Sequence, residues 1–262
     1  MLRYAGGKSR IVKQIAPRFL PAARYVEPFF GGGWVGFAYL RAHCPSASWI
    51  NDADPFVANL WQVIKNSPEE LKQLVTDEHT PDVDTYRKCL EHEILGAVTD
   101  PIADALGKLI VQKQSRGGLG ARAGSPIGGW DQAGCYEIDC RWNASRISKD
   151  IDAAHSLLKT SRITSLDFEE VLSECGPDDF VYLDPPYWER GKDMYCIHLT
   201  PRDHERLAAN LRKSAAKWLL SYDDCPEVRN LYSWAKVDTI NVRHGGEKKK
   251  SARELLIQSE AK

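Results

Sequence analysis

A carboxylate, two prolines and an aromatic ring stand together at the end of one apolar run of the sequence. The segment "VYLDPPYW", residues 181–188, carries Asp184, Pro185, Pro186 and Tyr187. Proline continues no helix and donates no backbone hydrogen bond, so the pair stiffens the turn while its carbonyl groups remain acceptors. The Asp184 carboxylate and a proline carbonyl are thus held beside a flat ring. The alternative is an ordinary Asp-Pro turn in which Tyr187 only packs.

Two acceptors beside a flat ring suit the exocyclic amino group of a nucleobase. Such an amine is a poor nucleophile because its lone pair is delocalised into the ring. Accepting both N–H hydrogens draws the nitrogen toward tetrahedral geometry and frees the lone pair to attack an electrophilic methyl group. A base becomes accessible to this chemistry only when it leaves the stack of bases. An aromatic ring at the site can then stack on the displaced base.

A second set of candidate residues surrounds a glycine-rich turn near the N-terminus. In "VEPFFGGG", residues 26–33, an expected strand meets three glycines, which let the backbone approach a ligand. The helix expected to follow would offer free N–H groups to a carboxylate. Asp52 follows about twenty residues later, at the end of the next expected strand, where an acid reaches a nucleoside ribose. The glycines alone also fit a plain turn, but together with Asp52 they favour a cofactor loop.

The segment "AGGKSR", residues 5–10, has part of a phosphate-binding loop. Gly7, Lys8 and Ser9 are in place, whereas Leu2 stands where the first glycine of that loop is needed. No strand is expected before it, so an ATPase is not expected. For Lys8, this motif alone leaves open a solvated position in an N-terminal turn.

Alternating strands and helices must position these residues. Apolar runs that end in acidic or polar residues recur along the chain and predict an α/β fold with an open, mostly parallel sheet. Ligands of such sheets bind at the carboxyl ends of the strands. The expected strands lie in residues 24–28, 48–52, 163–166, 179–184 and 217–224.

The middle of the chain has a different character. Helical periodicity with capping residues runs from about Leu60 to Ile110, and a glycine-rich loop follows at residues 115–134. We therefore expect a mainly helical insertion at residues 61–149, with residues 1–60 and 150–262 forming the catalytic domain.

The composition of the chain limits which kinds of protein and which kinds of binding site are expected. The 262 residues are 43% hydrophobic and 27% charged, as expected for a globular chain, and the formal net charge is −1. Any surface that binds nucleic acid must therefore be local. The 7 cysteines include no Cys-x-x-Cys pair, which favours free thiols and no metal site. No apolar stretch is long enough to span a bilayer, so the protein is expected to be intracellular and without a membrane partner.

At these residues the chain resembles the Dam-type, D12-class family of S-adenosylmethionine-dependent DNA N6-adenine methyltransferases. The resemblance covers most of the chain, and its motifs occur in the family's order. They are "YAGGK" (4–8), "VEPFFGGG" (26–33), "NDAD" (51–54), "LDF" (166–168) and "DPPY" (184–187), with the C-terminal "HGGEKKKSARELL" (244–256).

The resemblance implies a Rossmann-like class I methyltransferase sheet with an inserted, mainly helical target-recognition domain. It implies methyl transfer from S-adenosylmethionine, leaving S-adenosylhomocysteine, to N6 of a flipped-out adenine in double-stranded DNA, without a metal. The residues implied for the cofactor site are Tyr4, Ala5, Gly6, Lys8, Pro28, Phe29, Gly31, Gly33, Asp52, Asp167, Phe168 and Asp184. Asp52 would hold the ribose, and Asp167 and Phe168 would flank the cofactor's adenine. The catalytic motif would be Asp184, Pro185, Pro186 and Tyr187.

The expected DNA-reading residues lie in two positively charged segments. The family often carries Asn-Gly-Leu-x-Arg-x-Asn after the helical domain, whereas this chain has "GGLGARAG" at 117–124, without either asparagine. A GATC target is therefore in doubt. The arginine fork suits guanine and the lysine point charge suits phosphate. We thus assign base reading to Arg122 and Arg116 and backbone contacts to Lys248, Lys249 and Lys250, the alternatives being a surface loop and a solvated hairpin tip.

Two other functions remain open from the sequence. One is methylation of RNA or of a protein amide, although those enzymes more often carry Asn in place of Asp184. The other is a catalytically silent DNA-binding module, against which the intact Asp-Pro-Pro-Tyr motif argues. We expect a monomer in the cytoplasm of a prokaryotic or phage-infected cell, and an orphan or phage-type enzyme rather than one with a restriction partner.

Overall fold

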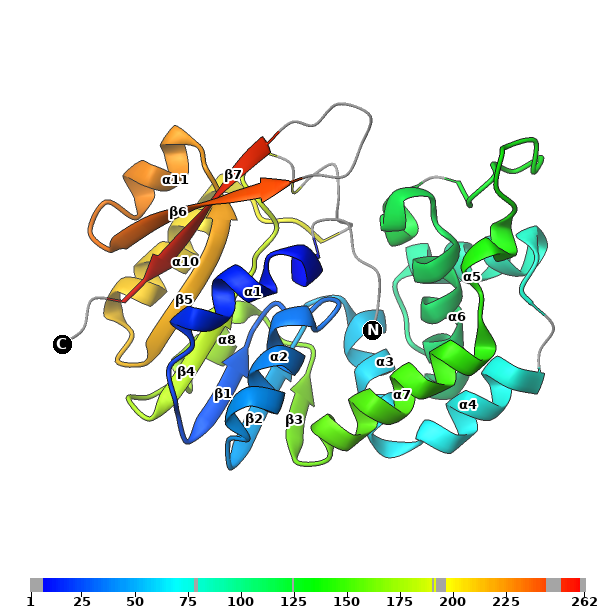
Figure 1. The fold of residues 1–262 in the computed structure, drawn as a ribbon, viewed down its shortest axis with the longest axis horizontal. Coiled ribbons are helices and arrows are strands. Elements are labelled where there is room, and N and C mark those ends of the chain that lie inside the picture. The colour runs from blue at the N-terminus through cyan, green and yellow to red at the C-terminus, as the bar shows by residue number, and fades with distance from the viewer. Residues whose placement is uncertain are drawn as a thin grey trace.

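A seven-stranded sheet forms one part of the protein, at the left of Figure 1. The computed structural model describes residues 7–77, 80–123, 125–189, 191, 197–243 and 251–259. The strand order is β3-β2-β1-β4-β5-β7-β6. The first five strands pair in parallel, and β7 runs antiparallel between β5 and β6. The strands are β1 (Arg24–Glu27), β2 (Ala47–Asn51), β3 (Ser161–Thr164), β4 (Asp179–Leu183), β5 (Lys217–Asp223), β6 (Lys236–Arg243) and β7 (Ser251–Gln258).

Both faces of the sheet are buried, because successive side chains of a strand point to opposite faces. On β4, Phe180 and Tyr182 join the core shared with the N-terminal helices, whereas Val181 and Leu183 join the core on the other face. The first core packs against η1 (Lys8–Arg10), α1 (Val12–Ile15), η2 (Ala16–Arg18) and α2 (Trp34–His43). The second packs against α8 (Phe168–Ser173), α10 (Pro201–Lys213) and α11 (Pro226–Leu231).

A group of helices lies beside the β3 edge of the sheet, at the right of Figure 1. It contains α3 (Pro55–Asn66), α4 (Pro68–Asp77), α5 (Val83–Leu95), α6 (Pro101–Gln114) and α7 (Ala144–Leu158). The expected limits of the insertion, 60/61 and 149/150, fall inside α3 and α7. These two helices therefore belong both to the helical group and to the packing next to the sheet.

The helices of this group begin where the sequence supplies capping side chains. Asp54 accepts hydrogen bonds from Phe56 N and Val57 N at the start of α3, and Asp100 does the same for α6. Asn143 accepts one from Arg146 N at the start of α7. Such caps satisfy N–H groups that have no partner within the helix.

The glycine-rich segment packs against α6 as short turns. It contains η3 (Arg116–Gly118) and η4 (Gly120–Ala123), and η5 (Ile138–Arg141) follows it. The Ser115 hydroxyl accepts a hydrogen bond from Gly120 N at 2.9 Å, and Gln112 donates to Gly118 O at 3.0 Å. Positive φ angles at Gly117, Gly118 and Gly120 explain why glycine recurs here.

Candidate active site

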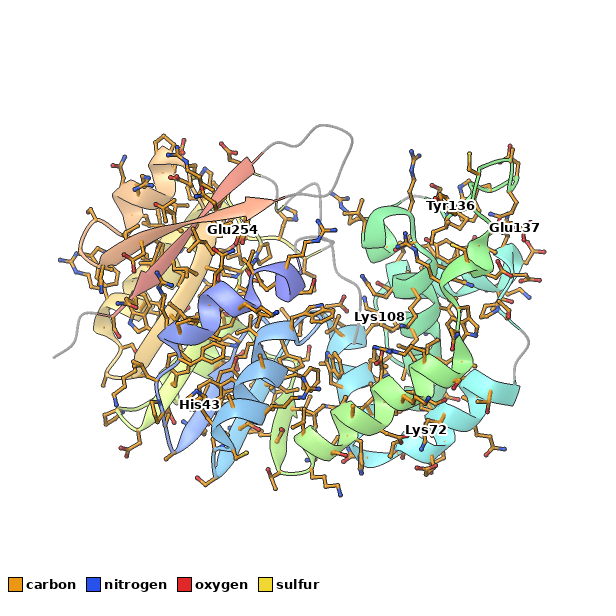
Figure 2. The ribbon with its side chains drawn as sticks, viewed as in Figure 1. His43, Lys72, Lys108, Tyr136, Glu137 and Glu254 are labelled. Carbon is orange, nitrogen blue, oxygen red and sulfur yellow. The ribbon has the colours of Figure 1, made fainter. Side chains whose placement is uncertain are left out.

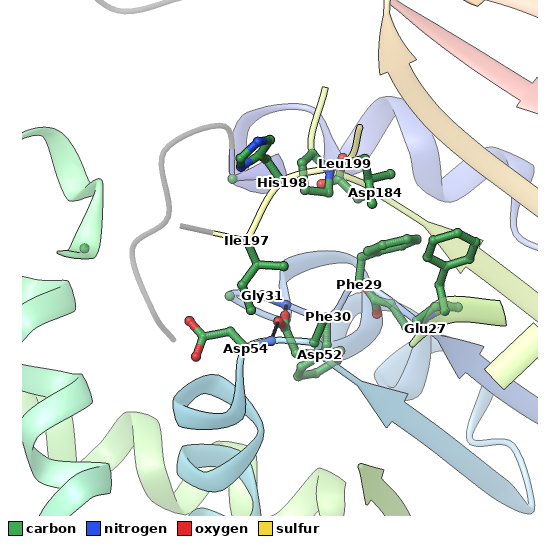
Figure 3. A pocket seen from close by; sticks show the side chains of 18 of the residues that line it. Glu27, Phe29, Phe30, Gly31, Asp52, Asp54, Asp184, Ile197, His198 and Leu199 are labelled. Carbon is green, nitrogen blue, oxygen red and sulfur yellow. Dashed lines mark hydrogen bonds between the residues drawn. The ribbon is translucent and has the colours of Figure 1, made fainter. Parts of the chain in front are cut away.

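The carboxyl ends of four parallel strands meet at one edge of the sheet and open into a cavity of about 240 Å³. Glu27 ends β1, Asp52 follows β2, Asp167 follows β3 and Asp184 follows β4. Figure 3 shows Asp52 below the Gly31 turn, with Asp184 on the opposite side of the cavity near Leu199. The residues expected at a cofactor site that line this cavity are Lys8, Pro28, Phe29, Gly31, Gly33, Asp52, Asp167, Phe168 and Asp184, together with Pro186 of the expected catalytic motif.

The glycine turn has a geometry that only glycine satisfies at one position. Gly31 and Gly33 have φ angles of +47° and +70°. A Cβ atom on Gly33 would lie 2.6 Å from the Phe37 ring and 2.8 Å from the Phe30 ring. The Trp61 indole donates to Gly31 O at 3.0 Å, so helix α3 supports the turn.

Asn51 at the end of β2 joins the two loops that flank the cavity. Its side-chain amide donates to Pro28 O and to Leu166 O, both at 3.0 Å. Its side-chain oxygen accepts from Leu166 N at 2.9 Å. The segment before Asp167 is thereby held against the glycine turn.

Asp52 is held by backbone N–H groups on both carboxylate oxygens. Oδ2 accepts from Gly31 N at 2.7 Å and Oδ1 accepts from Asp54 N at 3.0 Å; Figure 3 shows Asp52 between these two residues. Burial and the Asp54 carboxylate raise the pKa of Asp52 to about 7, against the lowering effect of these N–H groups and of Lys108. Asp52 thus titrates near neutral pH.

Lys8 pairs with the aspartate of the Asp-Pro-Pro-Tyr motif. Its ammonium lies 2.7 Å from Asp184 Oδ1, donates to the Tyr187 hydroxyl at 2.6 Å, and is 4% exposed. A solvated position for Lys8 is therefore wrong. Burial raises the pKa of Asp184 to about 6, and Lys8 lowers it.

Side chains of β5 and α10 pack against the turn that carries Tyr187 and hold it in place. The Tyr187 ring stacks on Tyr222, with centroids 6.0 Å apart. Asp223 accepts from Trp188 N at 3.2 Å and from Glu189 N at 3.0 Å. The buried His204 bonds the Tyr222 hydroxyl, and its pKa falls to about 4 because burial disfavours the charged ring. Pro185 is buried, and neither it nor Tyr187 lines the cavity directly.

A third buried carboxylate, which the sequence analysis did not single out, belongs to Glu27. It is 2% exposed, lines the cavity, and accepts a hydrogen bond from the Tyr25 hydroxyl at 2.7 Å. Burial raises the pKa of Glu27 well above its usual range, and the Asp184 and Asp52 carboxylates add to the rise. The acid in "VEPF" was the available signal, because a charged residue is rarely found inside a buried strand.

Asp167 and Phe168 begin α8 on the far wall of the cavity. Asp167 forms a capping box with Glu170 and lies 3.0 Å from Arg206. The Phe168 ring lies 5.7 Å from the Phe29 ring, centroid to centroid, and the Arg206 guanidinium is 4.8 Å from the Phe168 centroid. Arg206 lines the cavity, yet no sequence motif pointed to it.

The helical group also contributes to this cavity, which the sequence analysis did not anticipate. Lys108 on α6 lies 2.8 Å from Asp54 Oδ2 and 2.7 Å from Glu93 Oε1. In Figure 2 it lies on the side of the helical group that faces the sheet. Leu119, within the segment expected to read DNA, lines the cavity with these side chains.

The expected DNA-contacting residues are placed only in part. Arg116 in η3 and Arg122 in η4 are exposed. Lys248, Lys249 and Lys250 lie outside the described residues, as do the expected cofactor residues Tyr4, Ala5 and Gly6.

The described ranges lack two further kinds of feature. They contain no group of three His, Cys, Asp or Glu side chains that could hold a metal ion. They also contain no helix both long and apolar enough to cross a membrane.

The fold is that of an α/β protein with a cavity at the carboxyl ends of its parallel strands, where ligands of such sheets bind. The model of the D12 class N6 adenine-specific DNA methyltransferase family matches residues 4–91 and 132–244. The chain belongs to this family, and the resemblance stated from the sequence is confirmed.

The chain is similar in sequence to three methyltransferases. The chain is 25% identical over 201 residues to the Type II methyltransferase M1.LlaDCHI of Lactococcus lactis subsp. cremoris, covering 71% of this chain and 64% of the relative. It is 27% identical over 248 residues to the Type II methyltransferase M.MjaIII of Methanocaldococcus jannaschii, with coverages of 84% and 82%. It is 24% identical over 247 residues to the DNA N-6-adenine-methyltransferase of Escherichia phage P1, with coverages of 88% and 31%. The chain thus spans less than two thirds of the lactococcal and phage enzymes.

Proposed function

We propose that this protein transfers a methyl group from S-adenosylmethionine to N6 of an adenine that has left the stack of duplex DNA. The observation that carries the proposal is the cavity itself, where Asp184 faces the same space as the glycine turn and Asp52. Membership of the adenine-specific family supports DNA as the substrate. The aspartate at position 184 also supports DNA, because enzymes that methylate RNA or a protein amide more often carry asparagine there.

The residues of the cavity fit the proposed cofactor. When bound, S-adenosylmethionine supplies a methyl group on a positively charged sulfonium, and its product is S-adenosylhomocysteine. Glu27, Asp52 and Asp184 crowd three carboxylates around the cavity, and their pKa values are all raised. Burial is the main cause of each rise, because it disfavours the ionised carboxylate, and a cationic ligand in the cavity would favour the ionised form.

The parts of the cofactor can be assigned to parts of the cavity. Asp52 offers carboxylate oxygens to ribose hydroxyls, and the Gly31–Gly33 turn leaves room for the amino-acid portion, since nothing lies within 4 Å of a Cβ built on Gly31. Phe29 and Phe168 present apolar ring faces for the adenine, and Asp167 lies beside them. Lys8, assigned to this pocket with the other family residues, acts chiefly on Asp184.

The Asp-Pro-Pro-Tyr turn acts on the target base. Asp184 accepts one N–H of the adenine amine and a carbonyl of the proline pair accepts the other. The Lys8 ammonium lies 4.7 Å from the centroid of the Tyr187 ring, so this ring can stack on the base, an interaction worth about 1–3 kcal/mol, once Lys8 moves aside. After the amine is methylated it must lose one proton, and Asp184, with a pKa of about 6, is placed to accept it. Asp223 keeps the turn in position through the backbone of Trp188 and Glu189.

The helical group serves in this proposal as the target-recognition domain. Arg122, with Arg116, reads base edges from the glycine-rich segment, and Lys248 to Lys250 contact phosphates. The absence of both asparagines of the family's loop pattern predicts a target other than GATC.

A substrate comparison tests the proposed function. The purified protein, a radiolabelled methyl donor, and adenine-containing duplex DNA, RNA or protein extract are incubated separately. Label in duplex DNA, recovered as N6-methyladenine, is the expected result. Label only in RNA or protein, or DNA binding without any transfer, would replace the proposal with one of the two other functions.

A further inference from the structure

Glu254 is a buried carboxylate on the C-terminal strand β7, beside the catalytic turn. It is 7% exposed, and its Oε2 has no donor of good hydrogen-bond geometry among the described residues. The Tyr187 hydroxyl faces the same carboxylate, and this hydrogen bond contributes to the raised pKa of Tyr187, which burial dominates. In Figure 2 it lies on the sheet half of the protein, at the crossing of β6 and β7. A buried carboxylate oxygen without a well-placed donor costs free energy, and a cation that moved closer would lower this cost.

The nearest cation to that oxygen is the Lys8 ammonium, at 3.8 Å from Oε2. The same ammonium is 2.7 Å from Asp184 Oδ1 and 2.6 Å from the Tyr187 hydroxyl. An ammonium has three N–H donors. The Lys8 ammonium faces two carboxylates, Asp184 directly after β4 and Glu254 in β7. The ammonium is within hydrogen-bonding distance of Asp184, whereas its distance to Glu254 exceeds that of a hydrogen bond by about 1 Å.

Lys8 occupies one acceptor that the proposed reaction needs. Asp184 must accept an N–H from the adenine amine, and its Oδ1 already accepts from the ammonium. An amine that bonds Oδ1, rather than the second carboxylate oxygen, must share Oδ1 with the ammonium or displace it. Glu254 Oε2 offers a second carboxylate within a small movement of the lysine side chain.

We infer that Glu254 is a positioning residue that receives the Lys8 ammonium when the target amine takes Asp184. The inference rests on the proposed function. Lys8 would remain paired throughout, whereas without Glu254 the ammonium would compete with the adenine for Asp184.

The groups facing Asp184 give this exchange a signature in the pH profile. They are Lys8 from η1, Glu254 from β7, Glu27 from β1, Tyr182 from β4 and Tyr187 of the turn. Lys8 lowers the pKa of Asp184 and Glu254 raises it. Removing the Glu254 charge therefore lowers the pKa of Asp184, and removing the Lys8 charge raises it.

The test compares Glu254→Gln with the wild type in the methyl-transfer assay on duplex DNA. We expect kcat/KM at pH 8 to fall about tenfold through a higher KM for DNA, the effect of losing one charge-assisted contact. The acid limb of the profile should move to lower pH by up to about one unit. Lys8→Met should move it to higher pH, and in that background Glu254→Gln should change kcat/KM far less. Glu205→Gln, an exposed acid on α10, is the matched control and should change neither.

Unchanged KM and an unmoved acid limb in a folded Glu254→Gln protein would overturn the inference while leaving the proposed function intact. Failure of the wild type to methylate any duplex would instead overturn the proposed function. If Glu254→Gln does not fold, the wild type itself decides through the NMR signal of the Lys8 ammonium. That signal should shift when a duplex and S-adenosylhomocysteine are added together, and a constant signal would contradict the exchange.

Discussion

Cofactor affinity should depend on pH through Asp52. Its pKa is about 7 in the free protein because it is buried beside Asp54. Ribose hydroxyls donate to the ionised carboxylate, so binding favours the deprotonated form and lowers this pKa. Binding therefore releases a proton below pH 7, and affinity is highest above pH 7 and falls as the pH is lowered.

The size of the effect follows from the titration of this one group. Suppose that the cofactor binds only the protein in which Asp52 is ionised. The apparent Kd is then the intrinsic Kd multiplied by one plus the ratio of the proton concentration to Ka, where Ka is the acid dissociation constant of Asp52. From pH 7 to pH 5 the Kd should then rise about 50-fold for a pKa of about 7. Asp184, with a pKa of about 6, adds at most roughly a further 10-fold if it must also be ionised.

Isothermal titration calorimetry with S-adenosylhomocysteine measures this dependence in two buffers of different ionisation enthalpy. Asp52→Asn should weaken binding at pH 8 by about 10- to 150-fold, since a hydrogen bond to a charged group is worth about 1.5–3 kcal/mol. It should also lose most of the rise below pH 7. Asp54→Asn keeps the helix cap and removes the neighbouring charge, so it should move the dependence to lower pH.

Two results would refute this reasoning. A Kd that stays constant from pH 7 to pH 5 would show that Asp52 is not ionised on binding. An Asp52→Asn protein with the pH dependence of the wild type would assign the titration to another group.

Three other substitutions probe separate parts of the site. Gly33→Ala should lower the free energy of unfolding by about 1–3 kcal/mol in urea titrations, because its φ is +70° and the new Cβ meets Phe37 at 2.6 Å; unchanged stability would show that the turn can relax. Asp223→Ala should lower kcat on DNA while leaving calorimetric affinity for S-adenosylhomocysteine intact, because it releases only the turn after Tyr187; equal losses in both would contradict a local role. Arg122→Ala should cost about 1–3 kcal/mol on the preferred duplex only, and equal losses on a scrambled duplex in binding titrations would make it a phosphate contact.

Much of the fold was predictable because the pattern is local. Apolar runs ending in Asp52, Asp167 and Asp184 marked three strand ends, and parallel strands bring such ends to one edge. The predicted open, mostly parallel sheet is confirmed, with β7 antiparallel to its neighbours. The glycine turn was predictable too, since its positive φ angles restrict the residue type.

The contacts that tune the site could not be predicted, because they join residues far apart in the chain. Lys8 meets Asp184, and Glu254 approaches both only after β7 inserts beside β5. Lys108 meets Asp54 because α6 folds back onto the start of α3. A charged residue in a sequence shows no partner until the topology supplies one.

The most direct test of the account is single-molecule methylation mapping of DNA from cells that express the protein. The wild type should place N6-methyladenine at one recurring sequence, and an Asp184→Ala protein that still binds S-adenosylhomocysteine should leave the DNA unmethylated. Methylation by the Asp184→Ala protein, or unmethylated DNA from cells that contain folded wild-type protein, would contradict it.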